Sequence, residues 1–260
     1  MDTDKRPLIL VSNDDGYRAR GVRELIDMLR PFGEIVAVCP EGPRSGGSMA
    51  ITVNEALRLA EVPDFEGCKM YKVNGSPVDC VKLGFYVALG GRKPDLVVAG
   101  INHGSNSAVN VVYSGTMGAT FEGCAFGVPS VGFSLTDHDP QADFSGCRPF
   151  VEKIVEMTLR NGLPAGMCLN VNVPNSVEPP KEMRTVRAAR GNWNDEYQRY
   201  TDPFGRPFYW LTGSFHNEEP EARDTDEWCL AHGIVSVVPT LLDRTAPASG
   251  QPEWLRSLKF

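Results

Sequence analysis

The stretch ILVSNDDGY, residues 9–17, places an apolar run directly before two adjacent carboxylates. An apolar run that ends in Asn, Asp and Gly is typical of a buried strand followed by a turn, and we place the strand at residues 8–12. Asp14 and Asp15 repel each other in such a turn unless a cation, a basic side chain or water lies between them. The same dipeptide is also typical of an Asx-turn that caps the following helix. The dipeptide alone does not distinguish a cation site from a capped turn, so the rest of the sequence has to be considered.

Strand-like and helix-like segments alternate through the first two-thirds of the chain. The predicted strands are residues 8–12, 35–39, 96–99, 130–134 and 168–173, and the predicted helices are residues 22–29, 77–89, 117–126 and 147–161. This alternation predicts an α/β fold, in which a mostly parallel sheet has helices on both faces.

The pattern changes after about residue 174. The segment EYQRYTDPFGRPFYW, residues 196–210, predicts an aromatic hairpin around a DPFG turn, and residues 226–232 predict a short helix before a strand at 234–239. We interpret the chain as one domain, with a core at about residues 1–185 and a C-terminal extension at about residues 186–260. An exposed aromatic hairpin needs cover, so a partner subunit is expected.

Composition excludes several classes of protein. The 260 residues are 42% hydrophobic and carry a formal net charge of −7, which favours one large folded domain and argues against binding to a nucleic-acid polymer. The seven cysteines form no C-x-x-C pair, so we expect buried, reduced thiols. No signal peptide and no apolar run of about 20 residues is evident, which predicts a cytoplasmic protein without a membrane partner.

Polar loops follow three of the predicted strands. They are NDDG at residues 13–16, RSGGS at 44–48 and NHGSN at 102–106. Because ligands bind beyond the carboxyl ends of parallel strands, we expect these loops to meet at one edge of the sheet. Their donor groups are oxygens, from Asp14, Asp15, Ser45, Asn102 and Asn106. Such oxygens suit Mg²⁺, Mn²⁺ or Ca²⁺ better than Zn²⁺ or Cu⁺, so the aspartate pair predicts a site for a hard cation.

Two segments resemble anion cradles. In VYSGTMGA, residues 112–119, Ser114 or Thr116 can cap a helix while Gly115 frees backbone N–H groups for a phosphate. The RSGGS loop is a second cradle, with the Arg44 guanidinium nearby. Each cradle alone is also typical of ordinary capping or turn chemistry. Together with a cation pocket they predict phosphoryl transfer or the hydrolysis of a phosphate ester.

The motifs resemble those of the SurE family, the stationary-phase survival nucleotidases that release phosphate from nucleoside monophosphates. The resemblance covers nearly the whole chain and rests on SNDDG (12–16), GSPVDCV (75–81), PDLVVAGINHGSN (94–106), YSGTMGA (113–119) and RYTDPFGRPFYW (199–210). It implies a Rossmann-like core whose C-terminal extension is exchanged between the subunits of a homodimer or homotetramer.

The resemblance also implies a set of site residues. One divalent cation, Mg²⁺ or Mn²⁺, is expected on Asp14, Asp15, Ser45 and Asn102. Catalytic roles are expected for Asp14, Asp15 and Asn106, and contacts to the substrate phosphate for Asn13, Gly46, Ser114, Gly115 and Thr116. The expected activity is that of a metal-dependent 5′-nucleotidase, with in-line attack of water on a nucleoside monophosphate and no phosphoaspartate.

Rival functions and roles stay open. A nucleotide-binding sensor without catalysis would carry the same cradles, whereas a dinucleotide-dependent oxidoreductase should show G-x-G-x-x-G after the first strand. A haloacid-dehalogenase-like phosphatase should show D-x-D there. His103 is either a proton donor or a peripheral substitution, because the family pattern has a small residue at this position. The segment DHD, residues 137–139, is a second metal site, an acid–base pair or a plain polar loop after a strand.

Overall fold

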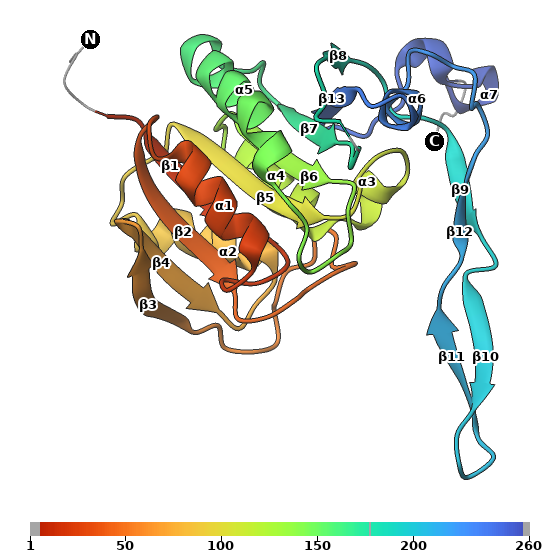
Figure 1. Cartoon of the computed structure of the whole chain (residues 1–260), viewed down its shortest axis with the longest axis horizontal. Helices are drawn as coiled ribbons and strands as arrows, with labels where there is room; N and C mark the ends of the chain where they lie inside the picture. Colours follow the sequence, from red (N-terminus) through yellow and green to blue (C-terminus); the bar gives the residue numbers. More distant parts are fainter. Residues whose placement is uncertain (1–5, 177, 257–260) are drawn as a thin grey trace.

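The computed structural model describes residues 6–176 and 178–256, and its body is built on one nine-stranded sheet (Figure 1). The order of strands across the sheet is β3 (Leu59–Phe65), β4 (Cys68–Val73), β2 (Glu34–Pro40), β1 (Leu8–Ser12), β5 (Leu96–His103), β6 (Ser130–Leu135), β7 (Met167–Val173), β13 (Val235–Leu241) and β8 (Met183–Thr185). The strands from β4 through β7 in this order are parallel to their neighbours. Strand β3 is antiparallel to β4, β13 is antiparallel to β7, and β8 is parallel to β13. The predicted mostly parallel sheet is confirmed.

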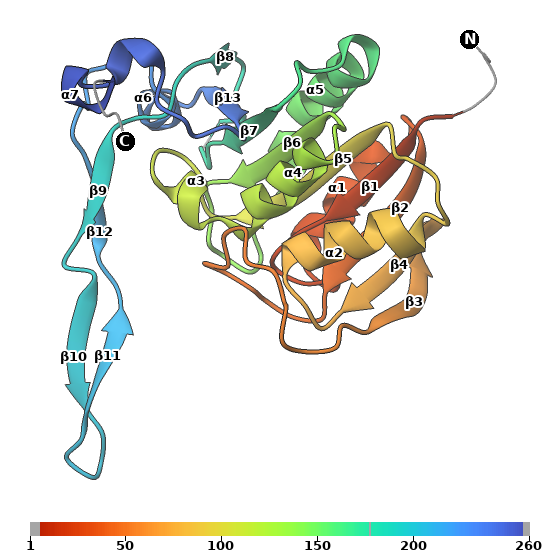
Figure 2. The same ribbon diagram turned by 180° about the vertical axis from the view of Figure 1, so that it is seen from behind.

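Helices cover both faces of this sheet. α1 (Arg20–Leu29) and α5 (Arg148–Asn161) lie on the face seen in Figure 1, and α2 (Pro77–Leu83) and α4 (Gly115–Ala125) lie on the face seen in Figure 2. Every residue of β1 is buried, and alternate side chains enter different cores. Ile9 and Val11 pack in the cluster that includes α1 and α5, whereas Leu8 and Leu10 pack in the cluster under α2 and α4.

Some elements differ from the predictions. The helix predicted at residues 77–89 is α-helical only over α2 and continues as a π-helix, η1 (Gly84–Ala88), since apolar spacing alone does not distinguish the two pitches. Strand β5 extends four residues beyond the predicted end at residue 99, and a short helix, α3 (Asn110–Tyr113), lies where no helix was predicted. Strands β3 and β4 were not predicted. They form the edge of the sheet, where β3 is largely exposed and carries a weak apolar pattern.

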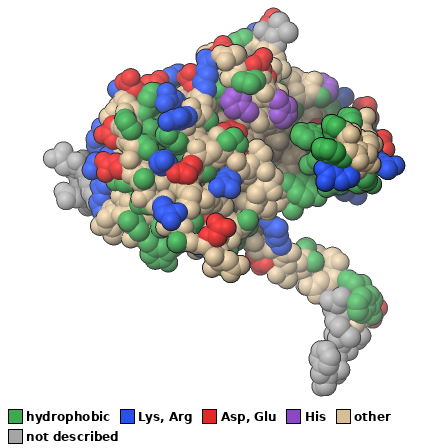
Figure 3. All heavy atoms as spheres, turned by 90° about the horizontal axis from the view of Figure 1, so that it is seen from below, with side chains coloured by type: hydrophobic (Ala, Val, Ile, Leu, Met, Phe, Trp, Pro, Cys, Tyr) green, Lys and Arg blue, Asp and Glu red, His purple; other side chains and the backbone are tan. Residues whose placement is uncertain are grey.

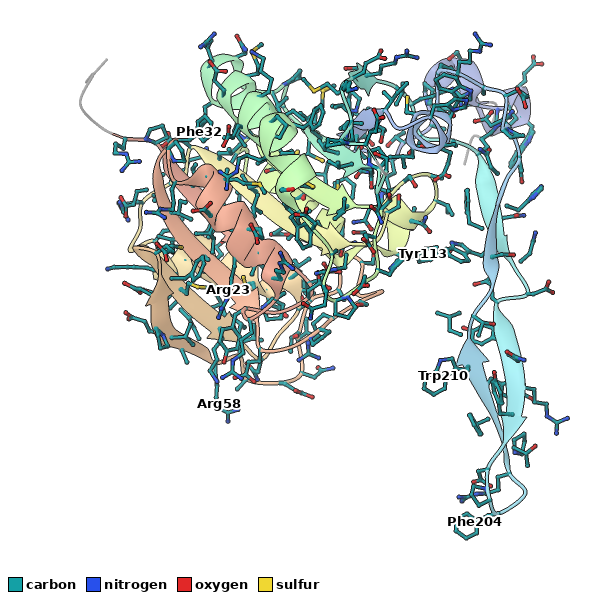
Figure 4. The ribbon with its side chains drawn as sticks, viewed as in Figure 1. Arg23, Phe32, Arg58, Tyr113, Phe204 and Trp210 are labelled. Atoms are coloured by element: carbon teal, nitrogen blue, oxygen red, sulfur yellow. The ribbon has the colours of Figure 1, made fainter. Side chains whose placement is uncertain are left out.

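A long arm leaves the body after β8. Its base pairs β9 (Gly191–Asn194) with β12 (Ser214–Asn217), and its outer part pairs β10 (Tyr197–Thr201) with β11 (Pro207–Leu211), which confirms the predicted aromatic hairpin. Figure 4 shows Phe204 at the tip and Trp210 on the side of the arm, and both side chains are exposed. The chain then returns through α6 (Asp226–Ala231) to β13 inside the sheet. The remaining short helices are η2 (Ser145–Cys147), η3 (Ala248–Gly250) and α7 (Glu253–Arg256).

Two further features of the fold concern its cysteines and the length of its helices. All seven cysteines are buried and unpaired, as predicted. Within residues 6–176 and 178–256, no helix has the length and apolar character that a membrane crossing requires.

Candidate functional site

The strand order reverses between β1 and β5, and the candidate site lies there. From β1 the chain moves to β2 on one side, while β5 lies on the other side and leads to β6. Adjacent parallel strands that diverge in this way leave a crevice beyond their carboxyl ends. The turn after β1 carries the two aspartates, and the end of β5 carries Asn102. The fold therefore brings together polar groups that lie almost 90 residues apart in the sequence.

Asn13 closes the turn after β1 instead of facing the crevice. Its side-chain amide donates to the carbonyl of Gly16 at 3.0 Å and accepts from the Gly16 N–H at 3.3 Å. Asn13 is almost fully buried and does not line the pocket described below. In the structure this residue shapes the loop that presents Asp14.

Asp14 is a buried carboxylate held from the start of α4. Thr116 donates its hydroxyl to Asp14 Oδ1 at 2.5 Å, and only 4% of Asp14 is exposed. Burial raises the pKa of Asp14 to about 6, although the hydrogen bond from Thr116 opposes the rise and the neighbouring Asp15 adds to it. A Cβ atom on Gly115 would lie 2.7 Å from Asp14 Cβ, so glycine is needed for this close approach. Gly115 and Thr116, which we expected to contact phosphate, contact the carboxylate in the structure.

Asp15 lies beside Asp14 and is partly buried. Burial raises its pKa, while the charge and the backbone N–H of His103 lower it, the N–H lying 3.5 Å from Asp15 Oδ2. Two adjacent carboxylates whose pKa values are both raised are stabilised by a cation. The capped-turn interpretation does not account for this pair, because the helix that follows, α1, has no side-chain cap.

The RSGGS loop reaches the same crevice from β2. The Arg44 N–H donates to the Asp14 carbonyl at 2.7 Å, and the Ser48 N–H donates to the Tyr113 carbonyl at 3.1 Å. Ser45 and Gly46 line the pocket. The Arg44 guanidinium donates instead to the Asn74 carbonyl at 2.9 Å and is not part of the lining.

Asn102 and Asn106 approach from β5 and the loop after it. The amide nitrogen of Asn102 donates to the carbonyls of His103 and Gly104, at 3.2 and 2.8 Å, which leaves its amide oxygen available to a cation. Asn106 is buried, and its amide nitrogen donates to the Ser134 hydroxyl at 2.8 Å. One of its two amide hydrogens remains available to a ligand.

These residues surround one pocket of about 460 Å³. Of the predicted site residues, it is lined by Asp14, Ser45, Gly46, Asn102, Asn106 and Ser114. Ser114 also caps α4 by accepting from the Met117 N–H at 3.0 Å, as predicted. Figure 3 shows histidine side chains grouped beside the hollow between body and arm, and His103 and His138 both line the pocket.

A larger cleft of about 700 Å³ lies at the opposite ends of the strands. Four of its charged groups pair with each other, Arg30 with Asp27 and Glu66, and Arg148 with Asp27. Glu34 pairs with Arg92 outside the cleft, and Arg6 donates to the Arg30 carbonyl. Because these charges neutralise one another, the smaller pocket is the better candidate for a catalytic site.

Several pocket residues were not predicted from the sequence. They are Ser107, Asn110, Tyr113, His138, Trp193, Phe215 and Glu227. His138 belongs to the DHD segment and lies so close to Gly104 that a Cβ there would be 2.2 Å from the ring. Trp193 and Phe215 come from the base of the arm, and Figure 4 shows Tyr113 on the side of the body that faces the arm.

The donor set fits a hard divalent cation. Within residues 6–176 and 178–256, no group of three or more His, Cys, Asp or Glu side chains is placed to hold a metal. The pocket instead combines carboxylate, hydroxyl and amide oxygens, which are ligands for Mg²⁺, Mn²⁺ or Ca²⁺.

The fold and the pocket define a doubly wound α/β protein with an oxygen-lined site where the strand order reverses. The chain belongs to the SurE family: a sequence profile described as "Survival protein SurE" matches residues 9–195. It is 51% identical over 242 residues to a protein of Bacteroides fragilis named "5'-nucleotidase SurE", covering 93% of this chain and 94% of the relative. A protein of the same name from Phocaeicola vulgatus is 50% identical over 242 residues and 93% of each chain. The crystal structure of the SurE protein from Aquifex aeolicus has a TM-score of 0.79 at 34% identity, and the match covers 92% of this chain and 95% of that one.

Proposed function

We propose that this chain is a metal-dependent 5′-nucleotidase that hydrolyses nucleoside monophosphates to nucleoside and phosphate. The observation that carries the proposal is the buried carboxylate of Asp14, which lines a pocket of nucleotide size together with Asn102 at the switch point of the sheet. The partly buried Asp15 follows it directly in the chain, outside the lining of the pocket. The similarity to relatives named "5'-nucleotidase SurE" supports the reaction.

We assign one divalent cation, Mg²⁺ or Mn²⁺, to Asp14, Asp15, Ser45 and Asn102. A bound ion of this kind supplies Lewis-acid polarisation of the phosphoryl group and activates water. Thr116 and Gly115 fix the position of Asp14, by a hydrogen bond and by close contact respectively. The carbonyls of His103 and Gly104 fix the amide of Asn102.

The phosphate is held opposite these carboxylates. We assign its oxygens to the remaining amide hydrogen of Asn106, to Ser114 and to the backbone at Gly46, all of which line the pocket. Donors placed in advance stabilise the charge that develops in the transition state without having to reorganise. With the Asp pair committed to the cation, hydrolysis proceeds without a phosphoaspartate.

We further propose that the protein works in the cytoplasm as a homodimer or homotetramer. The unpaired thiols support a reducing compartment. The exposed aromatic side chains of β10 and β11 support an interface at the arm.

The deciding experiment measures phosphate release from 5′- and 3′-nucleoside monophosphates after treatment with EDTA and after return of Mg²⁺, Mn²⁺ or Ca²⁺. We expect turnover only with metal, and a loss of at least about 100-fold in Asp14→Asn, because that variant removes a ligand charge. Asp64→Asn, an equivalent change on the exposed strand β3, is the control and should leave turnover unchanged. Binding of nucleotides without hydrolysis under every metal would replace the enzyme with a nucleotide sensor.

A further inference from the structure

A second carboxylate besides that of Asp14 lines the pocket, that of Glu227. It is partly buried, and its Oε1 accepts a short hydrogen bond from the Ser107 hydroxyl. Asp14 and Asp15 suit a phosphate pocket because a cation offsets them, but Glu227 comes from a different element, α6. A carboxylate without a compensating cation repels the phosphate of a ligand. It attracts instead a part of the ligand that donates hydrogen bonds. Glu227 therefore indicates that the part of the ligand next to it is rich in donors and is not the phosphate.

The position of Glu227 is fixed by its neighbours. Asp226 is fully buried and accepts hydrogen bonds at 2.8 Å from the N–H groups of Ala108, Ala189 and Glu227 itself. Thr225 caps α6 by accepting from the Trp228 N–H at 3.3 Å. The start of α6 is thus tied to the pocket loop and to the base of the arm. A carboxylate held this firmly can discriminate between ligands that differ by one hydroxyl.

Residues of the loop after β5 and of the base of the arm line the same pocket as Glu227. Asn106, on the phosphate side, is followed directly by Ser107, the partner of Glu227. Three residues later, Asn110 Oδ1 accepts from the indole N–H of Trp193 at 2.8 Å. Trp193 packs edge-on against Phe215, with ring centroids 6.1 Å apart, and both rings line the pocket. The pocket thus offers an amide donor for a phosphate at Asn106, an acceptor at Glu227 and two aromatic rings for a base.

We propose that Glu227 is a specificity-determining residue that accepts hydrogen bonds from the ribose hydroxyls of the substrate. This inference rests on the proposed nucleotidase function and names the sugar that the same site selects. Ser107 orients the carboxylate through Oε1, and Oε2 remains for the sugar. Amino groups of the base are the other donors that a carboxylate can bind, and the experiment below distinguishes them from the sugar hydroxyls.

The test compares kcat/KM for adenosine 5′-monophosphate and its 2′-deoxy and 3′-deoxy forms in the wild type, Glu227→Gln and Glu227→Ala. A hydrogen bond to a charged group predicts a preference for the ribonucleotide of about 10- to 100-fold in the wild type. Glu227→Ala should abolish this preference by slowing the ribonucleotide and not the form that lacks the hydroxyl. Glu227→Gln keeps one acceptor oxygen and should be intermediate. Glu221→Gln, on an exposed loop residue, should behave as the wild type.

A substrate without a sugar separates selection from folding. Hydrolysis of p-nitrophenyl phosphate should be unchanged in both Glu227 variants. An equal loss on every substrate would show that Glu227 only supports the loop, and would overturn the proposal. A wild type that treats ribose and deoxyribose alike would also overturn it. An altered ratio of adenosine to inosine monophosphate, with the sugar preference intact, would assign Glu227 to the base instead.

Failure of the proposed function gives a different result. If the wild type hydrolyses no phosphate ester under any metal, calorimetric binding of the same three nucleotides still tests Glu227. The same 10- to 100-fold preference in Kd, lost in Glu227→Ala, would support sugar recognition in a sensor, and equal Kd values would exclude it.

Discussion

The position of the Asp14 carboxylate depends on two small residues, Gly115 and Thr116, which were expected from the sequence to bind phosphate. Thr116 donates a hydrogen bond to it, and the missing side chain of Gly115 makes room for it. The site therefore requires the residues that position Asp14 as well as Asp14 itself. It follows that a substitution at a positioning residue should impair the site although every proposed metal ligand is kept.

Gly115→Ala should lower kcat/KM by about tenfold or more, because the new Cβ at 2.7 Å from Asp14 Cβ displaces the carboxylate. The metal concentration for half-maximal activity should rise as well. Phosphate release measured against metal concentration checks both effects. Gly146→Ala is the matched control, since a Cβ at Gly146 meets nothing within 4 Å. Equal activity of the two variants would remove Gly115 from the positioning of Asp14.

The sequence predicted the part of the pocket that lies in contiguous motifs. Asp14, Ser45 and Asn102 follow predicted strands, so the topology alone brings them together. Phe215 and Glu227 could not be predicted, because periodicity does not show which face of a distant hairpin or short helix turns toward the body. Asn13 and Thr116 were assigned to phosphate because their motifs resemble those of the family, but a motif does not reveal which partner a hydroxyl or amide selects in the folded chain.

Helix α2 illustrates how much one element depends on a single side chain. Asp79 accepts hydrogen bonds from the Ser76 N–H at 2.8 Å and from the N–H and hydroxyl of Thr52, at 3.1 and 2.7 Å. The hydroxyl of Ser76 in turn accepts from the Asp79 N–H at 3.1 Å, which completes a capping box. Burial acts to raise the pKa of Asp79, but these hydrogen bonds outweigh burial and hold the pKa below 3.8.

Asp79→Asn should lower the free energy of unfolding by about 1–3 kcal/mol at about pH 7. A carboxylate whose pKa is lower in the folded state contributes stability above its unfolded pKa, and loses it as the pH falls through the folded value. The difference between wild type and variant should therefore shrink only below about pH 4. Urea unfolding at a series of pH values measures it. Thr52→Val keeps the charge and should show a smaller loss with the same pH dependence, whereas a difference independent of pH would contradict the role of the ionised carboxylate.

Elements in the middle of the sheet were easier to predict than those at its edges. The residues of β1 are all buried and begin with a continuous apolar run, those of β6 are all buried, and in β7 only Met167 and Leu169 are partly exposed. The edge strand β3 has exposed polar residues between its apolar ones and was missed. A strand that is buried on both faces has an apolar run that can be recognised in the sequence, whereas an exposed edge strand has none.

At the scale of the whole molecule, the arm sets an inner section beside the pocket and an outer section in solvent. The inner section carries Trp193 and Phe215, which line the pocket. The outer section carries Tyr197, Phe204 and Trp210, which are exposed. The two sections are thus suited to different tasks, one for the ligand and one for a partner subunit.

Removal of residues 197–211 should therefore lower the oligomeric state without removing activity. The Thr212 N–H donates to the Glu196 carbonyl at 2.7 Å, so the two strands are close enough to be joined by a short turn. Light scattering coupled to size exclusion measures the mass, and phosphate release measures the site. Tyr86→Ser, at an exposed aromatic on the body, should keep the mass of the wild type. An unchanged mass after the deletion would place the subunit interface elsewhere.

The seven buried thiols have a practical consequence. Each is shielded from solvent, and in Cys39 and Cys147 burial raises the pKa well above the range in which thiolates form. Alkylating reagents should therefore leave the native protein untouched and modify it only when it opens. The chain carries its own unfolding reporters, distributed from β2 to α6, and the rate at which each cysteine is labelled would map local opening without any added probe.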